Sequence, residues 1–333
     1  MGSTPLVTVI IPTYNYGRYI CEAIDSVLAS TIPQSEIEII IIDDGSTDDT
    51  LEKVRAYGDR IQYIFQENQG KALATKVGVE RARGKYIFDL DADDLFLPEK
   101  LEEVVNVFES NEEVTHVGHP ALCWNVVAGT RTSEQLPDWL IGRKISGKEV
   151  LLEFYKKRIL FGGGSTFSAR AEVLKRCPIP EEVDMYIDEY LLLATLNNGY
   201  SYFIECPLSV WRVHGENYSE VDKGKKYSSL ARAKGERSRD SINAVLSAVL
   251  TGDFELEMKM LYTLKTKVSQ IAISEQAGNK SYADVLDLWK YLMGTFKVFG
   301  KESFTIMRSY TVLNRTLPTP VLQLAKRSLN KSS

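Results

Sequence analysis

Four aspartates lie close together in the segment KYIFDLDADD, at positions Asp89, Asp91, Asp93 and Asp94. Carboxylates this close repel one another and raise each other's pKa, so the cluster is expected to bind a positive partner. A divalent cation that is held by oxygen ligands and shared with a phosphate is the chemistry that suits such a group. The segment therefore predicts a metal site.

Two other interpretations of this segment can be weighed. A calcium loop of the EF-hand type needs Gly at loop position six and Glu at position twelve. Counted from Asp89, those positions hold Asp94 and Lys100, so this type of site is excluded. An acidic cap on the following helix would explain Asp93 or Asp94, but it would not explain Asp89 and Asp91, which belong to the strand-like run.

Two more polar segments, PTYN and IIDDGSTDD, follow apolar runs near the start of the chain. Pro12 ends the first run and exposes a carbonyl group. Tyr14 could stack on a nucleotide base, or it could pack between a strand and a helix. Asp44 could accept a hydrogen bond from an NH group of a base such as uracil. The alternative for Asp44 is a plain β-turn in front of a capped helix.

The remaining candidates lie further along the chain. Asp188 and Glu189 begin an apolar helical segment, where acids also occur simply because they suit the first turn of a helix. His214 is one of three histidines, and a lone histidine is more often structural than a ligand. The run Gly162–Gly164 could let an acceptor approach closely, or it could be a flexible turn.

Regular elements must bring these residues together. Apolar runs predict buried parallel strands at residues 6–12 and 36–43, and two further strands are predicted at residues 61–66 and 85–91. Amphipathic helices are predicted between them, and we expect the helix that begins near Lys71 to end at Gly84 in a left-handed stop. This alternation predicts a parallel α/β sheet. Ligands of such sheets bind beyond the carboxyl ends of the strands, where the polar segments lie.

Composition narrows the classes of function. The 333 residues are 44% hydrophobic and carry a net charge of -5, which argues against global disorder and against a nucleic-acid partner. The four cysteines show no zinc-site or disulfide spacing, and no apolar run is long enough to span a bilayer. A cytoplasmic protein without a signal peptide is expected. We expect a catalytic domain over residues 1–224 and a helical region over 225–333.

The segments VTVIIPTYNYGRYI, IEIIIIDDGSTDDT and NQGKALATKVGVERARGKYIFDLDADD, followed by an acidic pair and WRVHGENYS, resemble the family 2 glycosyltransferases of the GT-A fold. The resemblance covers residues 6–219. It implies a mostly parallel nucleotide-sugar-binding sheet flanked by helices, with Mn²⁺ or Mg²⁺ as the cofactor. It also implies inverting transfer of a sugar from a nucleotide sugar, most often a UDP-sugar, to an acceptor hydroxyl.

Site roles follow from the same resemblance. The residues implied to bind the donor are Pro12, Tyr14, Asp44, Lys71 and Asp91. Asp91 and Asp93 would form the DxD metal pair with His214 as a further candidate ligand, and Asp188 would be the catalytic base. The chain departs from the family pattern at Thr75-Lys76, where Arg-Asn is frequent. The QxxRW motif of processive members is absent, so one sugar is expected to be transferred per binding event.

The resemblance also implies that the acceptor is a saccharide or a lipid-linked molecule and that the enzyme acts in cell-surface polysaccharide synthesis. Between Lys301 and Ser333 basic residues outnumber the single acid Glu302. This tail could bind the inner face of the plasma membrane peripherally, or its apolar residues could pack on the protein or on a second subunit. Two other functions stay open, a sugar nucleotidyltransferase and a non-catalytic nucleotide-sugar or polysaccharide binding module.

Overall fold

A computed structural model describes residues 4–157, 164–183, 187–215, 217, 255–276 and 282–309. Of the described residues, those within Met1–Leu151 and Phe161–Gly224 form one compact unit. Those within Leu152–Leu160 and Lys225–Ser333 form a second. Most of the basic tail expected at residues 301–333 therefore lies outside the described residues.

The first unit is built around a mixed sheet. Its described strands are β1 (Val7–Thr13), β2 (Ile37–Asp43), β3 (Gln62–Phe65), β4 (Tyr86–Asp89), β6 (Val114–Gly118), β9 (Lys144–Ser146), β10 (Ser168–Arg170) and β11 (Tyr200–Phe203). They are ordered β3-β2-β1-β4-β10-β6-β11-β9. Strands β1 to β4 are parallel, whereas β10 is antiparallel to both of its neighbours. The four strands expected near the start of the chain are confirmed. A strand-like segment was also expected at residues 164–170, where β10 lies, but its antiparallel place between β4 and β6 was not predicted.

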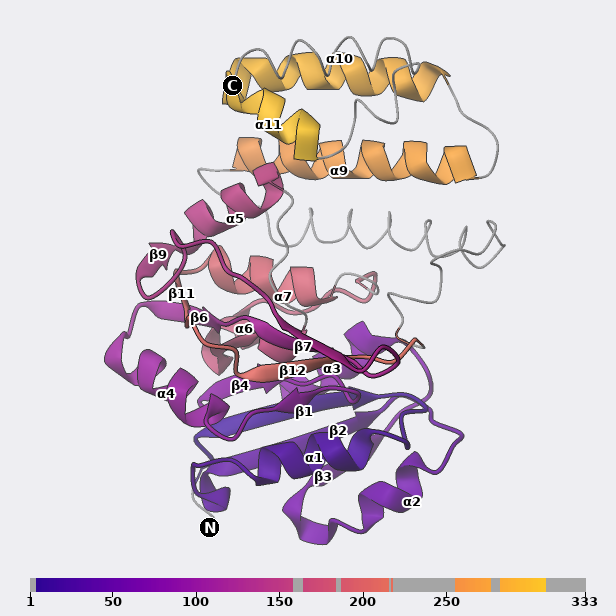
Figure 1. The fold of residues 1–333 in the computed structure, drawn as a ribbon, viewed down its shortest axis with the longest axis vertical. Coiled ribbons are helices and arrows are strands. Elements are labelled where there is room, and N and C mark those ends of the chain that lie inside the picture. The colour runs from indigo at the N-terminus through magenta and orange to yellow at the C-terminus, as the bar shows by residue number, and fades with distance from the viewer. Residues whose placement is uncertain are drawn as a thin grey trace. The chain divides into compact units, whose positions relative to one another are not determined.

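Helices cover both faces of this sheet (Figure 1). On one face α1 (Ile20–Leu28), α2 (Thr50–Arg55) and α4 (Lys100–Ser110) share a core with residues of β1 and β2. On the other face α3 (Lys71–Arg81) contacts α6 (Ala171–Arg176) and α7 (Ile187–Leu196). The helix α5 (Gly147–Lys157) begins in the first unit, and its residues from Leu152 onward belong to the second. The α/β fold class predicted from the sequence is confirmed.

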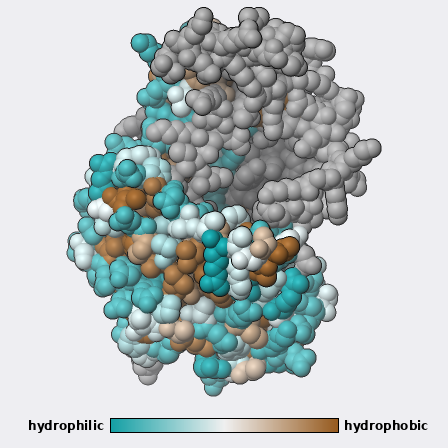
Figure 2. Space-filling model, viewed as in Figure 1, coloured by the Kyte–Doolittle hydropathy of each residue, from teal (hydrophilic) through white to brown (hydrophobic). Residues whose placement is uncertain are grey.

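A smaller sheet lies beside the acidic segment. It consists of β5 (Leu95–Phe96), β12 (Ser209–Val213), β7 (Ala121–Asn125) and β8 (Thr130–Ser133), in that order. Leu97 N donates a hydrogen bond to Leu208 O at 2.9 Å, so the residues after the acidic segment are tied to the start of β12. On the face of the first unit shown in Figure 2, hydrophobic residues form scattered patches among hydrophilic ones.

The expected end of α3 at Gly84 is wrong. The helix ends at Arg81, and Gly84 does not have a positive φ. A Cβ at Gly84 would lie 2.5 Å from the backbone N of Thr8, and Gly84 N donates a hydrogen bond to Thr8 Oγ1. Glycine is needed here because two backbone segments approach closely, not because a helix stops.

The second unit contains three described helices, α9 (Glu255–Gln276), α10 (Tyr282–Phe299) and α11 (Glu302–Ser309). Helices α9 and α10 pack side by side (Figure 1). Tyr155 Oη and Tyr262 Oη lie 2.5 Å apart and share a hydrogen bond inside this unit. In the part of the chain that the structure describes, no helix combines the length and the apolar character needed to cross a bilayer.

Candidate active site

Lys71 lies at the centre of a group of carboxylates. It is the first residue of α3, and its Nζ is 2.6 Å from Asp91 Oδ1, 3.0 Å from Asp188 Oδ1 and 4.0 Å from Asp89 Oδ2. Burial alone would lower the pKa of Lys71, but Asp188, Asp91 and Asp89 raise it well above its usual value. Lys71 is therefore an ammonium ion that neutralises part of the acidic cluster.

Asp89 ends β4 and is almost fully buried. Neither of its carboxylate oxygens has a hydrogen-bond partner among the described residues. Burial raises the pKa of Asp89 to about 7, and Lys71 acts in the opposite direction. A buried carboxylate without donors is costly, so Asp89 marks a position where a further positive or hydrogen-bonding group would be stabilised.

Gly164 closes the other side of this group. A Cβ at Gly164 would lie 2.4 Å from Asp89 Oδ2 and 3.2 Å from both Asp188 Oδ1 and Lys71 Nζ. The chain thus passes directly over the carboxylates, and only glycine leaves them in place. This contact lies within the protein, so the acceptor approach that was one interpretation of the glycine run stays a prediction. Gly162 and Gly163 lie outside the described residues.

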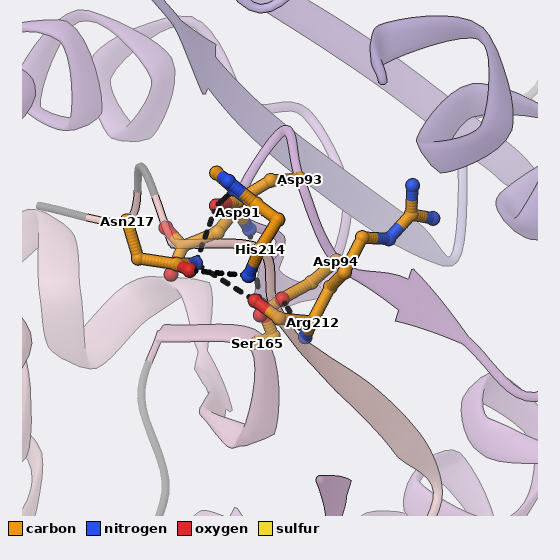
Figure 3. A network of polar contacts seen from close by, with 7 residues as sticks. All are labelled: Asp91, Asp93, Asp94, Ser165, Arg212, His214 and Asn217. Carbon is orange, nitrogen blue, oxygen red and sulfur yellow. Dashed lines mark hydrogen bonds and ion pairs between the residues drawn. The ribbon is translucent and has the colours of Figure 1, made fainter. Parts of the chain in front are cut away.

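Asp93 belongs to a second group that reaches it from the end of β12 (Figure 3). His214 Nε2 is 3.0 Å from Asp93 Oδ2, and Asn217 Nδ2 donates to the same oxygen at 3.1 Å. Asn217 also accepts a hydrogen bond from His214 N at 2.7 Å and donates one to Arg212 O at 2.7 Å. The Tyr19 ring lies 4.7 Å from the His214 ring, centre to centre. Asn217 therefore fixes the turn that carries His214.

Asp94 does not face this group but anchors the acidic segment from behind. Ser165 Oγ donates to Asp94 Oδ2 at 2.6 Å, and Arg212 N donates to Asp94 Oδ1 at 2.9 Å. Ser165 Oγ also accepts a hydrogen bond from Asp91 N at 3.1 Å. Burial, with contributions from Asp91 and Asp93, raises the pKa of Asp94 well above its usual value. Asp94 thus joins three segments that are distant in the sequence (Figure 3).

The candidate nucleotide-binding residues lie at the ends of β1 and β2. Tyr14 is 46% exposed, so its ring is accessible for stacking. Pro12 is buried inside β1, which continues to Thr13, so it does not end its strand. Asp44 is buried and accepts hydrogen bonds from Gln66 Nε2, Gln69 N and Gly70 N at 2.7, 2.9 and 2.8 Å. It therefore holds the loop that leads into α3 and Lys71.

The sequence predictions are brought together in part. Lys71, Asp91 and Asp188 meet, and Asp93 meets His214, whereas Pro12, Tyr14 and Asp44 lie at the neighbouring strand ends. Asp188 contacts Lys71, while Glu189, the next residue of α7, is buried.

Sequence reasoning missed Ser165 and Asn217. Ser165 follows the glycine run Gly162–Gly164, which was considered only as a place of acceptor approach or as a flexible turn. Asn217 follows His214 by three residues, in a segment that had no periodic signal.

No three side chains of His, Cys, Asp or Glu in the described ranges converge as a preformed metal cage. Hard cations of the magnesium type are commonly held by one or two carboxylates together with substrate phosphates, so such a cage is not required. The carboxylate oxygens suit Mn²⁺ or Mg²⁺, whereas an imidazole such as that of His214 is a ligand more typical of softer divalent metals. The carboxyl group of Asp89, which has no hydrogen-bond partner among the described residues, lies 4.0 Å from Lys71 in the same cluster.

Sequence comparison gives one family match and several partial relatives. A profile described as Glycosyl transferase family 2 matches residues 8–176. An uncharacterized glycosyltransferase of Nostoc sp. (strain PCC 7120) is 34% identical over 220 residues, which cover 63% of this chain and 66% of the relative. One from Rickettsia prowazekii is 40% identical over 119 residues, 35% of this chain and 37% of the relative. The chain thus spans less than two thirds of these relatives.

Two solved structures share the fold. TarS of S. aureus, in complex with UDP-GlcNAc, has a TM-score of 0.58 at 18% identity, over 93% of this chain and 81% of that one. The mannosyltransferase PcManGT of Pyrobaculum calidifontis, in complex with GDP-Man and Mn²⁺, has a TM-score of 0.55 at 21% identity, over 94% and 86%. At this level of identity the likeness establishes architecture alone, and it agrees with the fold predicted from the sequence.

Proposed function

The chain belongs to glycosyl transferase family 2, as its motifs predicted, and on this basis we propose that it transfers one sugar at a time from a nucleotide sugar to an acceptor hydroxyl. The donor is a UDP-sugar, and the acceptor is a saccharide or lipid-linked saccharide of cell-surface polysaccharide synthesis. The observation that carries the proposal is the meeting of Lys71, Asp91 and Asp188 beside the Asp93–His214 pair, at the carboxyl edge of the sheet.

Asp188 is the proposed base. Its carboxylate accepts the proton of the acceptor hydroxyl while the oxygen attacks C1 of the sugar. The C1–O bond to the diphosphate breaks, and the electron pair leaves with the diphosphate. Attack from the face opposite the leaving group inverts the configuration at C1. A positioned base contributes about 10²–10⁴ in rate. The proximity of Asp188 to Lys71, at 3.0 Å, supports a role beside the phosphates that Lys71 would bind.

Donor binding is assigned to residues at the ends of β1 and β2 and to Lys71. Tyr14 would stack on the base, and Pro12 would border it within β1. Asp44 already accepts three hydrogen bonds from the loop before α3, and a carboxylate has about four acceptor sites. One site is therefore left for an NH group of the base. Lys71 would exchange its contact with Asp188 for the diphosphate, which frees the base.

Asp91, Asp93 and His214 would hold Mn²⁺ or Mg²⁺. When bound, the cation supplies positive charge that stabilises the leaving diphosphate. Asn217 keeps the turn of His214 in place by its hydrogen bonds to Asp93 and to the backbone. PcManGT, whose fold this chain shares, was solved with Mn²⁺, which supports the choice of metal. The basic tail, most of which lies outside the described residues, would bring the enzyme to lipid-linked acceptors at the cytoplasmic leaflet.

A donor screen tests this proposal. The protein is incubated with a panel of UDP- and GDP-sugars with Mn²⁺ or with EDTA, and release of the nucleoside diphosphate is measured. We expect release from at least one UDP-sugar with Mn²⁺ and its loss with EDTA. The anomeric configuration of a product, followed by NMR, should be opposite to that of the donor. Pyrophosphate release from a nucleoside triphosphate and a sugar phosphate would instead show a nucleotidyltransferase.

A further inference from the structure

Lys100 is a lysine that is fully buried in the first unit. It is the first residue of α4, and its Nζ donates hydrogen bonds to Ser165 O at 2.5 Å and to Ser209 Oγ at 3.1 Å. The amine also lies 3.6 Å from the centre of the Phe96 ring. Nothing in the proposed chemistry uses this side chain, yet it occupies the space behind the acidic segment.

The partners of Lys100 are the two segments that close the site. Ser165 follows Gly164, which lies directly against Asp89, and Ser165 Oγ bridges Asp91 N and Asp94 Oδ2. Ser209 begins β12, which leads to Arg212 N on Asp94 and to His214 on Asp93.

Ser209 Oγ also donates to Ser165 O at 2.5 Å, so the two segments meet at the same carbonyl that Lys100 binds.

Packing alone does not explain a lysine at this position. Taking an amine out of water is unfavourable, and burial lowers the pKa of Lys100 well below its usual value. A methionine has a similar length and would fill the same space without that cost. Methionine would, however, leave Ser209 Oγ without its donor. It would also leave the buried carboxylates of Asp89 and Asp94, whose charges act to raise the pKa of Lys100, without a nearby amine. The lysine is thus explained by the polar contacts that it makes and not by the space that it fills.

We propose that Lys100 is a positioning residue, which fixes the 164–166 turn and the start of β12 against the acidic segment through the carbonyl of Ser165. By this contact it sets the spacing between the Asp89–Asp91–Asp188 group and the Asp93–His214 pair. The role in catalysis rests on the proposed function, whereas the role in fixing the turn does not. A displacement of about 1 Å in such a site can cost 10²-fold in rate.

The test is Lys100→Met in the full chain, with Thr8→Val as the matched control. Thr8 is equally buried and also loses two hydrogen bonds, to Glu38 and from Gly84 N, but it lies at the opposite end of β1 from the site. Amide hydrogen exchange, Mn²⁺ affinity by electron paramagnetic resonance and thermal unfolding are measured for both variants. Exchange requires no activity, so it reports on Lys100 even if the donor screen fails.

For Lys100→Met we expect faster exchange, by about 10-fold or more, in peptides covering residues 91–97 and 164–170. The affinity for Mn²⁺ should fall by about 10–100-fold, as for other residues that support metal ligands. The melting temperature should fall in both variants, because each leaves buried hydrogen-bond partners unpaired. Thr8→Val should leave these peptides and the Mn²⁺ affinity as they were. Unchanged exchange and Mn²⁺ affinity in a folded Lys100→Met would overturn the proposal.

Two further variants make the result decisive. If Lys100 acts through Ser165, then Lys100→Met and Ser165→Ala should not be additive, and the double variant should bind Mn²⁺ about as weakly as the weaker single one. Multiplicative losses would contradict the proposed route. Should Lys100→Met fail to fold, Lys100→Gln leaves the contact of Ser209 with Ser165 O in place and shortens the side chain, so that its donor moves away from that carbonyl. Faster exchange at residues 164–170 in that variant supports the proposal, and no change there refutes it.

Discussion

Replacing Lys71 by methionine removes the ammonium group that lies among Asp89, Asp91 and Asp188. Lys71 Nζ lies 2.6 Å from Asp91, 3.0 Å from Asp188 and 4.0 Å from Asp89. At an effective dielectric constant of about 20, the gross attractions of these pairs are about 6, 5.5 and 4 kcal/mol, in the same order. Desolvation of the same charges offsets most of this sum. The Lys71 side chain is also 33% exposed, so solvent screens the attractions further. We expect a net loss of about 2–4 kcal/mol of folding stability at pH 8.

The loss should depend on pH in a defined direction. Burial raises the pKa of Asp91, and it raises the pKa of Asp89 to about 7. Such carboxyls destabilise the folded state while they are ionised, and the cost disappears as the pH falls through the folded-state pKa. Removing Lys71 raises these pKa values further. The deficit of Lys71→Met should therefore be full near pH 8 and shrink towards about pH 4, the pKa of Asp in an unfolded chain.

The assay is thermal unfolding by circular dichroism, without divalent cations, from pH 8 to pH 5. The expected drop at pH 8 is about 5–15 °C for a unit of this size. Lys76→Met is the control, because Lys76 lies on the same helix and its ion-pair partner Glu181, at 4.0 Å, is 82% exposed. An exposed pair of this kind contributes at most about 1 kcal/mol. Equal melting of the two variants at pH 8, or a gap that widens at pH 5, would refute the reasoning.

Three further variants test the rest of the site. Asp93→Asn should fold normally and lose Mn²⁺-dependent UDP binding in calorimetry, because a neutral amide is a weak ligand for a hard cation. Binding of UDP as tight as in the parent protein would exclude Asp93 as a metal ligand. Gly164→Ala should lower kcat/KM by about 10-fold or more, since its Cβ would lie 2.4 Å from Asp89 Oδ2, and full activity would show that the turn yields. Asp188→Asn should keep the affinity for the donor, and its rate of sugar transfer should fall by about 10²-fold or more. If Glu189→Gln is the inactive variant instead, the assignment of Asp188 as the base is wrong.

The first two strands could be predicted from the sequence because each is a continuous apolar run, and the third and fourth because they continue the alternation of strands and helices. A strand-like segment was also visible at residues 164–170, but its antiparallel place in the sheet depends on pairing with β4 and β6, which no local pattern shows. Gly84 was misinterpreted for a similar reason. Its role depends on the backbone of Thr8, which is far away in the sequence.

The residues of the site also fall into those that the local sequence predicts and those that it does not. The clustering of Asp89, Asp91 and Asp93 at a strand end is local, so spacing alone predicted a charged centre there. The contacts of Asn217 with Asp93 and of Ser165 with Asp94 join residues separated by 124 and 71 positions. Their side-chain types are common in loops, and nothing near them in the sequence marks them as partners of an acid. Such pairs become visible only when the fold places them together.

The position of β10 in the middle of the sheet affects the order in which the protein can assemble. Strands β1 to β4 pair with neighbours from the same stretch of chain, so they can associate as soon as they leave the ribosome. The second edge of β4 stays unpaired until residues 168–170 have been synthesised, because its partner there is β10. A fragment that stops before β10 would therefore expose an apolar edge strand, and edges of this kind pair with other chains and aggregate.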